Sequence, residues 1–380
     1  MVFIPGRAHP SRPGISCSSM QPVEHQHDPH KPPHPPQRVH PSIQDVADEA
    51  GVSIATVSRV LNSPNLVAPA TASRVRQAVE KLGYVPNAFA QGLITRASKV
   101  LALALPDIHG EFYSELLRGA DGAAKALGYH LLVASAQGTP ADADMGLGPV
   151  LGLVDGIALM VTEPNDALLK RAASARIPAV VLDAPDPHHA DSITVDNHAG
   201  ATQATEHLLS LVSPRDAYFA GGPPENYDSK TRAQAFLETL KAHGNHVPAD
   251  HVASGSFSFE WGERFARGLI KDGRLRGAGI LAGNDEIAYG IIHAAEAEGL
   301  IPPRDFVIVG FDDTRLASLI RPTLSSVRVP MSDAGAKAVG LLVNRIKNPN
   351  LPPQRVSLTP TLVPRQTTAS APARPRPPAR

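Results

Sequence analysis

Short apolar runs alternate with longer helical patterns over most of the chain, from about Lys99 to Thr368. The runs are rich in Val, Ile, Leu and Ala, and most are bounded by Gly, Pro, Asp or Asn: VLALALP, YHLLVASA, DGIALMV, AVVLDA, DSITVD, DAYFAGG, AGILAGN and DFVIVGFDD. Strands that alternate with helices predict parallel sheets covered on both faces. We therefore expect an α/β core over residues 99–368.

Residues 43–62, IQDVADEAGVSIATVSRVLN, follow a different pattern, in which two short helical stretches flank a tight corner at Gly51. Ser42 and Ser53 are suited to cap the two helices. Apolar residues recur at spacings of three and four in both helices, at Val46, Ala47, Ala50, Val57, Val60 and Leu61. This arrangement predicts a helix-turn-helix, whose second helix enters the DNA major groove. An ordinary helical hairpin with a glycine turn is the alternative.

The second of these helices leaves small and polar side chains on its outward side. Arg59 can reach a guanine edge or a phosphate, and the hydroxyls of Thr56 and Ser58 can hold phosphates. An alanine at position 55 contributes at most a methyl contact, as to thymine. The candidate DNA contacts in this segment are Ser53, Ile54, Ala55, Thr56, Ser58, Arg59 and Asn62.

A third helix is expected through ATASRVRQAVEKLGY, ending at Gly83, and a short one could follow in residues 87–93. The whole stretch resembles the LacI/GalR family of bacterial repressors. The resemblance is carried by D-V-A-x-x-A-G-V-S-x-x-T-V-S-R-V-L-N, which begins at Asp45, and by L-G-Y-x-P-N-x-x-A-x-x-L, which ends at Leu93. It implies a hinge helix that folds on the operator and wedges the leucine between base pairs. It therefore adds Tyr84, Asn87, Ala90 and Leu93 to the candidate DNA contacts.

The α/β core resembles the effector-binding core of the same family, which looks like a type I periplasmic sugar-binding protein. That resemblance implies two similar lobes, a cleft between them and three crossover strands. We expect the first lobe to hold residues 99–196 and 327–345. The second lobe is expected to hold residues 197–326 and the C-terminal strands.

Acidic and amide side chains stand where several of the expected strands end. Ligands in such folds bind beyond the carboxyl ends of the strands. These side chains are therefore expected to face one cleft and to bind the hydroxyl groups of a polyhydroxylated ligand. A helix N-cap is the alternative for each Asp taken singly. The candidates of this kind, with one neighbouring aromatic residue, are Asp183, Asn197, Asn284, Asp285, Phe311 and Asp312.

The resemblance implies further effector contacts. Arg232, in an S-x-x-R-x-x-x-F segment, matches an arginine that grips the effector, often a sugar or a purine, with a planar fork. Phe112, Tyr113 and Phe257 would line the pocket, although ordinary core aromatics are the alternative. Glu111 departs from the commoner family pattern, in which Asn-Pro precedes the aromatic residue. If Glu111 faces the ligand, a strongly anionic effector is disfavoured.

Composition narrows the class of protein. The net charge is zero over 380 residues, so any attraction to DNA must be local, as in the basic stretch 59–99. Cys17 is the only cysteine, which excludes an intrachain disulfide and a cysteine-based zinc site. No apolar run approaches the ~18 residues that span a membrane, and we expect a cytoplasmic protein. No P-loop, nucleophile elbow or dinucleotide fingerprint is present, so neither an enzyme nor a cofactor is expected.

The two ends of the chain are expected to be disordered tails, Pro/His-rich in residues 1–41 and Pro/Arg-rich in residues 369–380. Metal sensing by the N-terminal histidines is an alternative to a plain tail. Residues 42–86 would form the DNA-binding domain and residues 87–98 the hinge. Together these features predict a homodimeric repressor on a pseudo-palindromic operator, switched by a small-molecule effector. A transcriptional activator, or a solute-binding protein without DNA function, is the alternative.

Overall fold

The computed structural model describes residues 41–85, 97–106, 111–135, 150–160, 172–183, 190–244 and 249–369. The chain divides into two compact units, Met1–Pro86 and Asn87–Arg380. The expected hinge residues Asn87, Ala90 and Leu93 lie outside the described residues. Of the two expected tails, only Pro41 and Ala369 lie within the described residues.

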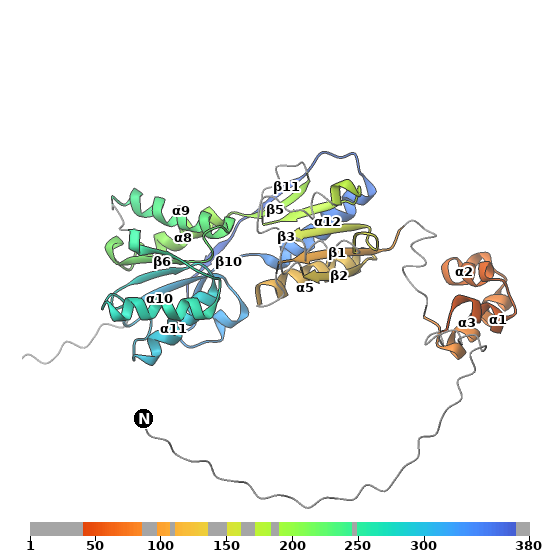
Figure 1. Cartoon of the computed structure of the whole chain (residues 1–380), viewed down its shortest axis with the longest axis horizontal. Helices are drawn as coiled ribbons and strands as arrows, with labels where there is room; N and C mark the ends of the chain where they lie inside the picture. The colour runs from red at the N-terminus through yellow and green to blue at the C-terminus, as the bar shows by residue number, and fades with distance from the viewer. Residues whose placement is uncertain are drawn as a thin grey trace, which may run out of the picture. The chain divides into compact units, whose positions relative to one another are not determined.

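The N-terminal unit is a three-helix domain built from α1 (Ile43–Ala50), α2 (Ile54–Asn62) and α3 (Pro69–Leu82), with a short 3-10 turn, η1 (Pro64–Leu66), before α3 (Figure 1). Ser42 begins α1 with a capping box, in which its hydroxyl accepts the Asp45 N–H and its own N–H donates to the Asp45 carboxylate. Gly51 ends α1 at φ +64°, where a side chain would be strained. The Ser53 hydroxyl then caps α2 by accepting the Thr56 N–H. The expected helix-turn-helix is confirmed.

A small apolar core holds these three helices together. Its fully buried members are Val46, Ala47, Ala50, Val57, Val60, Ala72, Val75 and Ala78. They recur at the three- and four-residue spacing that places side chains on one helix face. The outward face of α2 is left to the residues proposed to contact DNA.

The C-terminal unit contains two six-stranded sheets, and we call each sheet with its helices a lobe. The sheet of lobe 1 has the order β11-β5-β4-β3-β1-β2, and its pairs are parallel. Its strands are β1 (Val100–Leu105), β2 (His130–Ser135), β3 (Gly156–Met160), β4 (Ala179–Leu182), β5 (Asp191–Val195) and β11 (Arg355–Leu358). Helices α5 (Glu111–Ala126) and α12 (Met331–Lys347) pack together against it.

The sheet of lobe 2 has the order β12-β10-β9-β8-β6-β7, and only the β10–β12 pair is antiparallel. Its strands are β6 (Ala217–Gly221), β7 (Val252–Ser254), β8 (Gly279–Ala282), β9 (Val307–Asp312), β10 (Ser325–Arg328) and β12 (Thr361–Val363). The short 3-10 turns beside them are η2 (Pro214–Asp216), η3 (Ala249–His251), η4 (Arg315–Ser318) and η5 (Gln366–Thr368).

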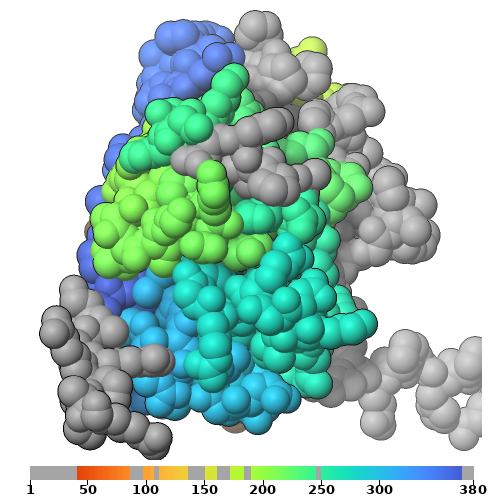
Figure 2. All heavy atoms as spheres, turned by 90° about the vertical axis from the view of Figure 1, so that its left-hand side faces the viewer, coloured from red at the N-terminus to blue at the C-terminus, as the bar shows by residue number. Residues whose placement is uncertain are grey.

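Two pairs of helices cover the two faces of this second sheet. Helices α8 (Asn197–Leu209) and α9 (Tyr227–Ala242) pack on one face, and α10 (Phe259–Lys271) and α11 (Asp285–Ala297) on the other (Figure 1). In the space-filling view of this lobe, the green segments around α8 and α9 lie against the cyan segments around α10 and α11 (Figure 2). The expected parallel α/β architecture is confirmed.

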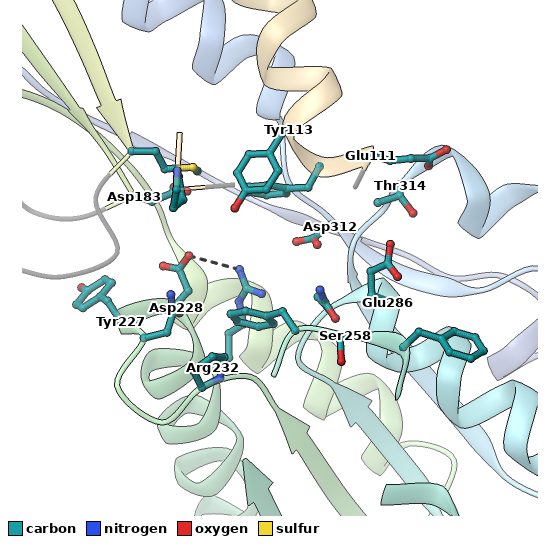
Figure 3. A pocket seen from close by; sticks show the side chains of 18 of the residues that line it. Glu111, Tyr113, Asp183, Tyr227, Asp228, Arg232, Ser258, Glu286, Asp312 and Thr314 are labelled. Atoms are coloured by element: carbon teal, nitrogen blue, oxygen red, sulfur yellow. Dashed lines mark ion pairs between the residues drawn. The ribbon is translucent and has the colours of Figure 1, made fainter. Parts of the chain in front are cut away.

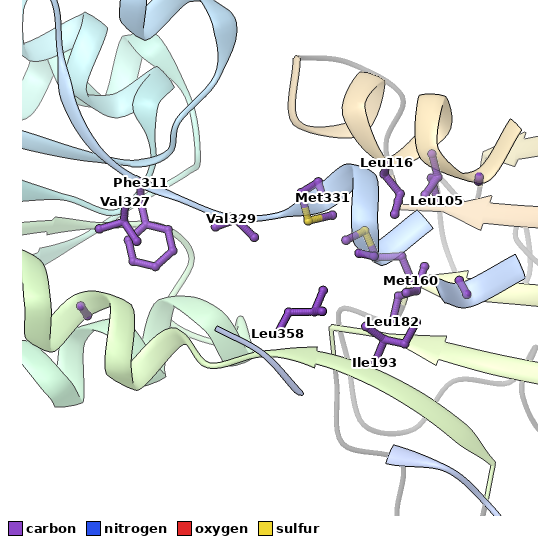
Figure 4. Packing of buried hydrophobic residues seen from close by; sticks show 14 of the residues in the cluster. Leu105, Leu116, Met160, Leu182, Ile193, Phe311, Val327, Val329, Met331 and Leu358 are labelled. Carbon is purple, nitrogen blue, oxygen red and sulfur yellow. The ribbon is translucent and has the colours of Figure 1, made fainter. Parts of the chain in front are cut away.

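Three chain crossings join the lobes: β5 to α8, β10 to α12, and β11 to β12. Apolar residues on and beside these crossings continue one buried cluster from lobe to lobe, among them Val327, Val329, Met331 and Leu358 (Figure 4). The crossings are therefore packed into the interior, where they join the two lobes.

The expectation that both C-terminal strands belong to the second lobe is wrong for β11. That strand pairs in parallel with β5, so it closes the edge of the first sheet. The physical reason is a buried carboxylate on β5: Asp191 forms an ion pair with Arg345 at 2.8 Å and accepts the Gln354 N–H at 2.7 Å. These bonds hold the segment before β11 beside β5, and only β12 joins lobe 2.

Candidate functional site

A pocket of about 910 Å³ lies between the two lobes, where the carboxyl ends of their strands face each other. Lobe 1 contributes the ends of β1, β3 and β4, and lobe 2 contributes the ends of β6, β8 and β9 (Figure 3). Seven of the predicted effector contacts line it: Phe112, Tyr113, Asp183, Arg232, Phe257, Asn284 and Asp312. Parallel strands point their carboxyl ends the same way, which is why residues far apart in sequence meet here.

Arg232 is fixed at one wall of the pocket by several partners. Its Nε donates to the Asn197 side-chain oxygen at 2.8 Å, and its Nη1 donates to the Gly283 carbonyl at 2.6 Å. Its Nη2 lies 3.9 Å from the Asp228 carboxylate, the ion pair drawn dashed in Figure 3. The side chain is almost fully buried, but the guanidinium has N–H groups that these bonds do not use. It is therefore a preorganised, positively charged donor.

Three predicted contacts, Asn197, Asp285 and Phe311, do not line the pocket. All three are buried, and they form a layer behind it. The Asn197 amide bridges Arg232 and Asp228, donating to the latter at 2.8 Å. Their part in the site is to hold the residues that do face the cavity.

Asp285 supports a different part of the wall. Its carboxylate accepts the N–H and the hydroxyl of Thr314, at 2.8 and 3.0 Å, and the Ser326 hydroxyl at 2.6 Å. Burial raises the pKa of Asp285 to about 7, although these three donors favour its ionised form. Thr314 lines the pocket, and Ser326 lies on β10, the strand that leads into one of the crossings between the lobes. Asp285 therefore connects the pocket wall to that crossing.

The pocket wall has far more acidic than basic side chains. Seven carboxylates line it, namely Glu111, Asp183, Glu225, Asp228, Glu260, Glu286 and Asp312, whereas Arg232 is the single cation among the lining residues. Burial raises the pKa of Asp183 and of Asp312 well above the ordinary value, and Arg232 opposes that shift in both. Such a wall suits a ligand that donates hydrogen bonds, as hydroxyl groups do.

Two of these carboxylates belong to residues with strained backbone. Asp183 has φ +62° and Asp312 has φ +109°, a region that non-glycine residues avoid. Each such residue costs of order 1–3 kcal/mol, and such costs concentrate at functional sites. The strain therefore favours a role in ligand binding for the two strand ends.

Several lining residues were not singled out from the sequence, namely Met160, Phe259, Glu286 and Thr314. A strand end offers a usable signal for one of them, because Met160 is the last residue of β3. The segment Asn226–Asp228, which the sequence places near the pocket, does line it. Phe259 and Glu286 lie in the first turns of α10 and α11, where the sequence does not show which way a side chain turns.

The predicted DNA contacts of α2 lie on one side of the N-terminal domain. Ser53, Ile54, Ala55, Arg59 and Asn62 are exposed, and Thr56, Ser58 and Tyr84 are half-buried. All three hydroxyls of this face have local partners, because the Ser53 and Thr56 hydroxyls lie 3.0 Å apart and the Asn62 amide donates to the Ser58 hydroxyl at 3.3 Å. The structure thus brings a hydroxyl-rich face and the exposed cation Arg59 to the surface of the described domain.

No helix in the described parts of the chain is long and apolar enough to cross a membrane. Within those same parts, no three His, Cys, Asp or Glu side chains are grouped as metal ligands. The N-terminal histidines lie outside them.

Two family models match this sequence. Residues 42–87 match the model described as bacterial regulatory proteins, lacI family. Residues 205–368 match a periplasmic binding protein-like domain. The first covers the helix-turn-helix domain, and the second covers most of lobe 2 together with later segments of lobe 1.

Known proteins match over nearly their whole length. Catabolite control protein A of Priestia megaterium is 33% identical over 331 residues, which are 86% of this chain and 99% of that protein. The ribose operon repressor of Escherichia coli (strain K12) is 31% identical over 329 residues, 85% of this chain and 98% of that protein.

Solved structures of transcriptional regulators are also similar to this chain over nearly their whole length. The Lac repressor dimer bound to operator and the anti-inducer ONPF superimposes with a TM-score of 0.77 at 25% identity, covering 87% of this chain and 100% of that one. A complex of the transcriptional regulator CelR with cellobiose gives 0.66 at 28% identity, covering 86% and 100%.

Proposed function

Because the chain belongs to the lacI family of bacterial regulatory proteins, we propose that it is a transcriptional repressor controlled by a small molecule bound between its lobes. The observation that carries this proposal is the pocket itself, in which a fixed arginine and strand-end carboxylates surround an open cavity. The relatives are regulators by name, in keeping with the expectation of a protein that is not an enzyme.

The DNA-binding part of the proposal rests on the outward face of α2. Arg59 would contact a base edge or a phosphate, and the hydroxyls of Ser53, Thr56 and Ser58 would bind phosphates. By resemblance, Tyr84, Asn87, Ala90 and Leu93 would add contacts from the hinge. The chain would act in the cytoplasm as a homodimer, so that two such domains meet two half-sites of a pseudo-palindromic operator.

The effector we propose is an uncharged sugar or a similar polyol. The Asp183, Asp228 and Asp312 carboxylates would accept its hydroxyl hydrogens, and Arg232 and Asn284 would donate to its oxygens. The aromatic side chains of Phe112, Tyr113 and Phe257 would pack on its apolar ring face. Relatives named for ribose and crystallised with cellobiose support this class of ligand. The excess of carboxylates disfavours a phosphate or a sugar acid.

The proposed switch is a shift between two arrangements of the lobes. A ligand that touches both lobes stabilises the arrangement in which its contacts are complete. In the chain, lobe 1 directly follows residues 87–98, the hinge segment after the DNA-binding domain. A rotation of lobe 1 would therefore move this segment and change operator affinity. The ligand shifts the equilibrium because it binds one arrangement of the lobes more tightly than the other.

Thermal unfolding of the purified full chain tests the effector class. The panel compares uncharged sugars with the matching sugar acids, sugar phosphates and purines. A ligand at 100 times its dissociation constant adds about 2.7 kcal/mol to the free energy of unfolding, which raises the melting temperature by a few degrees. We expect this shift with an uncharged sugar and none with its phosphate. A shift given only by the phosphate or the acid would contradict the proposed class.

A further inference from the structure

One hydrogen bond crosses the cleft between the lobes away from the three chain crossings. The Glu111 carboxylate, on the first residue of α5 in lobe 1, accepts the Leu316 N–H in η4 of lobe 2 at 3.0 Å. The two residues are 205 positions apart in sequence. Figure 3 shows Glu111 beside Thr314 at one end of the pocket. The bond therefore ties the two lobes together at the rim of the ligand cavity.

The lobe 1 end of this bond is mechanically fixed. Helix α5 packs closely on α12: a Cβ at Gly119 would lie 1.8 Å from the Ser332 carbonyl oxygen, and one at Gly335 would lie 2.1 Å from that of Leu116. Such backbone-to-backbone packing leaves the two helices no room to slide independently. Helix α5, which begins at Glu111, is therefore held tightly within lobe 1.

The lobe 2 end is fixed as well, through the residues just before Leu316. The Asp312 carbonyl accepts the Val329 N–H, and the Asp313 carboxylate forms an ion pair with Arg328 at 2.7 Å. Thr314 is held through its N–H and its hydroxyl by Asp285, as described above. Segment 312–316 therefore joins the pocket wall, the β10 crossing and the contact with lobe 1 in five consecutive residues.

The Leu316 N–H has no helical partner of its own, because the first N–H groups of a helical turn lack one. A carboxylate from the opposite lobe satisfies it. Glu286 also lines the pocket, and its negative charge repels that of Glu111. The bond thus works against a like-charge repulsion, which suits a contact that must be reversible.

We propose that Glu111 is a positioning residue, whose hydrogen bond to Leu316 biases the lobes toward the closed arrangement before any effector is present. The proposal rests on the proposed function only in taking lobe closure as the switch. A pre-closed cleft lowers the cost that a ligand meets when it closes the lobes, and it sets the operator affinity of the empty protein. Glu111 therefore contributes to the resting state of the regulator.

Distances between spin labels on the two lobes test this directly. The full chain offers a simple background, since Cys17→Ser removes its one cysteine. Lys125→Cys on α5 and Arg267→Cys on α10 provide exposed labelling sites in lobes 1 and 2. Labelled chains are diluted with unlabelled chains so that only distances within one chain are measured, without effector and without DNA.

Glu111→Ala is expected to move the distance distribution toward longer values, changing the ratio of open to closed forms roughly threefold to tenfold, as for the loss of one hydrogen bond. Glu111→Gln keeps an acceptor oxygen and should retain the closed distribution. Glu115→Ala, one turn further along α5 and outside the pocket lining, is the matched control and should change nothing. Circular dichroism verifies that each variant is folded.

Two results would overturn the proposal. One is a Glu111→Ala distribution identical to that of Glu115→Ala. The other is equal opening in Glu111→Gln and Glu111→Ala, which would assign the effect to charge rather than to the hydrogen bond. Neither result bears on ligand binding, because the measurement contains no effector. The effector pocket is tested separately, by thermal unfolding.

Discussion

The guanidinium of Arg232 lies over the Phe311 ring, with Cζ 3.8 Å from the ring centroid. Phe311 is fully buried at the end of β9, and the next residue, Asp312, faces the pocket. One strand end therefore supplies both the ring on which the arginine rests and a carboxylate in the same pocket with which it interacts electrostatically. A cation on an aromatic face gains up to about 2 kcal/mol when desolvated, so this stacking helps to keep a buried arginine charged.

The planar shape of Arg232 is predicted to matter more than its charge. Arg232→Lys retains a cation but cannot keep both the Asn197 and Gly283 bonds together with the ring stacking. We expect the effector-induced rise in melting temperature to be lost in Arg232→Lys and in Arg232→Ala, while operator binding of the empty protein stays within about threefold. Thermal unfolding and fluorescence anisotropy measure the two properties. A normal effector response in either variant would remove Arg232 from the site.

The buried carboxylate of Asp285 is predicted to make stability depend on pH. Its folded-state pKa of about 7 lies above the ordinary value of 3.8. A raised folded-state pKa means that the folded protein holds the proton more tightly. The contribution of Asp285 is then complete below about pH 4 and is lost as pH rises toward 7.

Asp285→Asn removes this titration; its side-chain oxygen can still accept from Thr314, and its NH2 group can donate to the Ser326 hydroxyl. The free energy of unfolding of the variant should therefore fall less than that of the parent between about pH 5 and about pH 7.5. Urea unfolding at both pH values provides the comparison. Parallel pH profiles for the two proteins would show that Asp285 does not titrate in this range.

Arg59 is predicted to read DNA from the exposed face of α2. If it contacts a base, Arg59→Ala should weaken operator binding by about 1–3 kcal/mol and relax specificity at one position. If it contacts only a phosphate, binding to all DNA sequences should weaken by a similar factor. The slope of the logarithm of affinity against the logarithm of salt concentration should then fall in magnitude by about one. Arg76→Ala on α3 is the control, because its Nε donates to its own helix at Ala72. Unchanged operator binding in Arg59→Ala would contradict this use of α2.

The contact between α5 and α12 gives a matched pair of glycine substitutions. In Gly119→Ala the new Cβ would lie 1.8 Å from the Ser332 carbonyl oxygen, so the helices must separate. A destabilisation of about 1–3 kcal/mol is expected from such overpacking. Gly122→Ala, on the same helix, meets no atom within 4 Å and should be neutral or stabilising by up to about 1 kcal/mol. Equal stability of the two variants in urea would show that this packing is looser than described.

Much of the fold and part of the site could be predicted from sequence because both follow local rules. Alternating strands and helices indicate a parallel sheet, and strand ends converge on one edge, which identified Asp183, Asn284 and Asp312. The same rule was wrong for the direct neighbours of two of these residues, Phe311 and Asp285, which lie behind the pocket wall. Phe311 precedes Asp312 on a strand, and successive side chains of a strand point to opposite faces. Asp285 follows Asn284 at the start of α11, and its side chain points into the protein interior.

The remaining differences come from contacts between distant segments. Strand β11 carries no long apolar run, and its sheet is decided by the bonds of Asp191 to Arg345 and Gln354. The bond from Leu316 to Glu111 likewise joins two lobes and leaves no local pattern. Sequence periodicity reports which side of an element is buried, but it does not report the partner that covers that side.

The central claim is that a ligand in the pocket and the operator on the DNA-binding unit influence each other. The measurement that tests it most directly is operator affinity by fluorescence anisotropy, with and without a saturating sugar identified by thermal unfolding. We predict a change of roughly fivefold or more, and an equal change in sugar affinity when operator is bound, because such coupling is reciprocal. A sugar that stabilises the protein but leaves operator affinity unchanged would contradict the account.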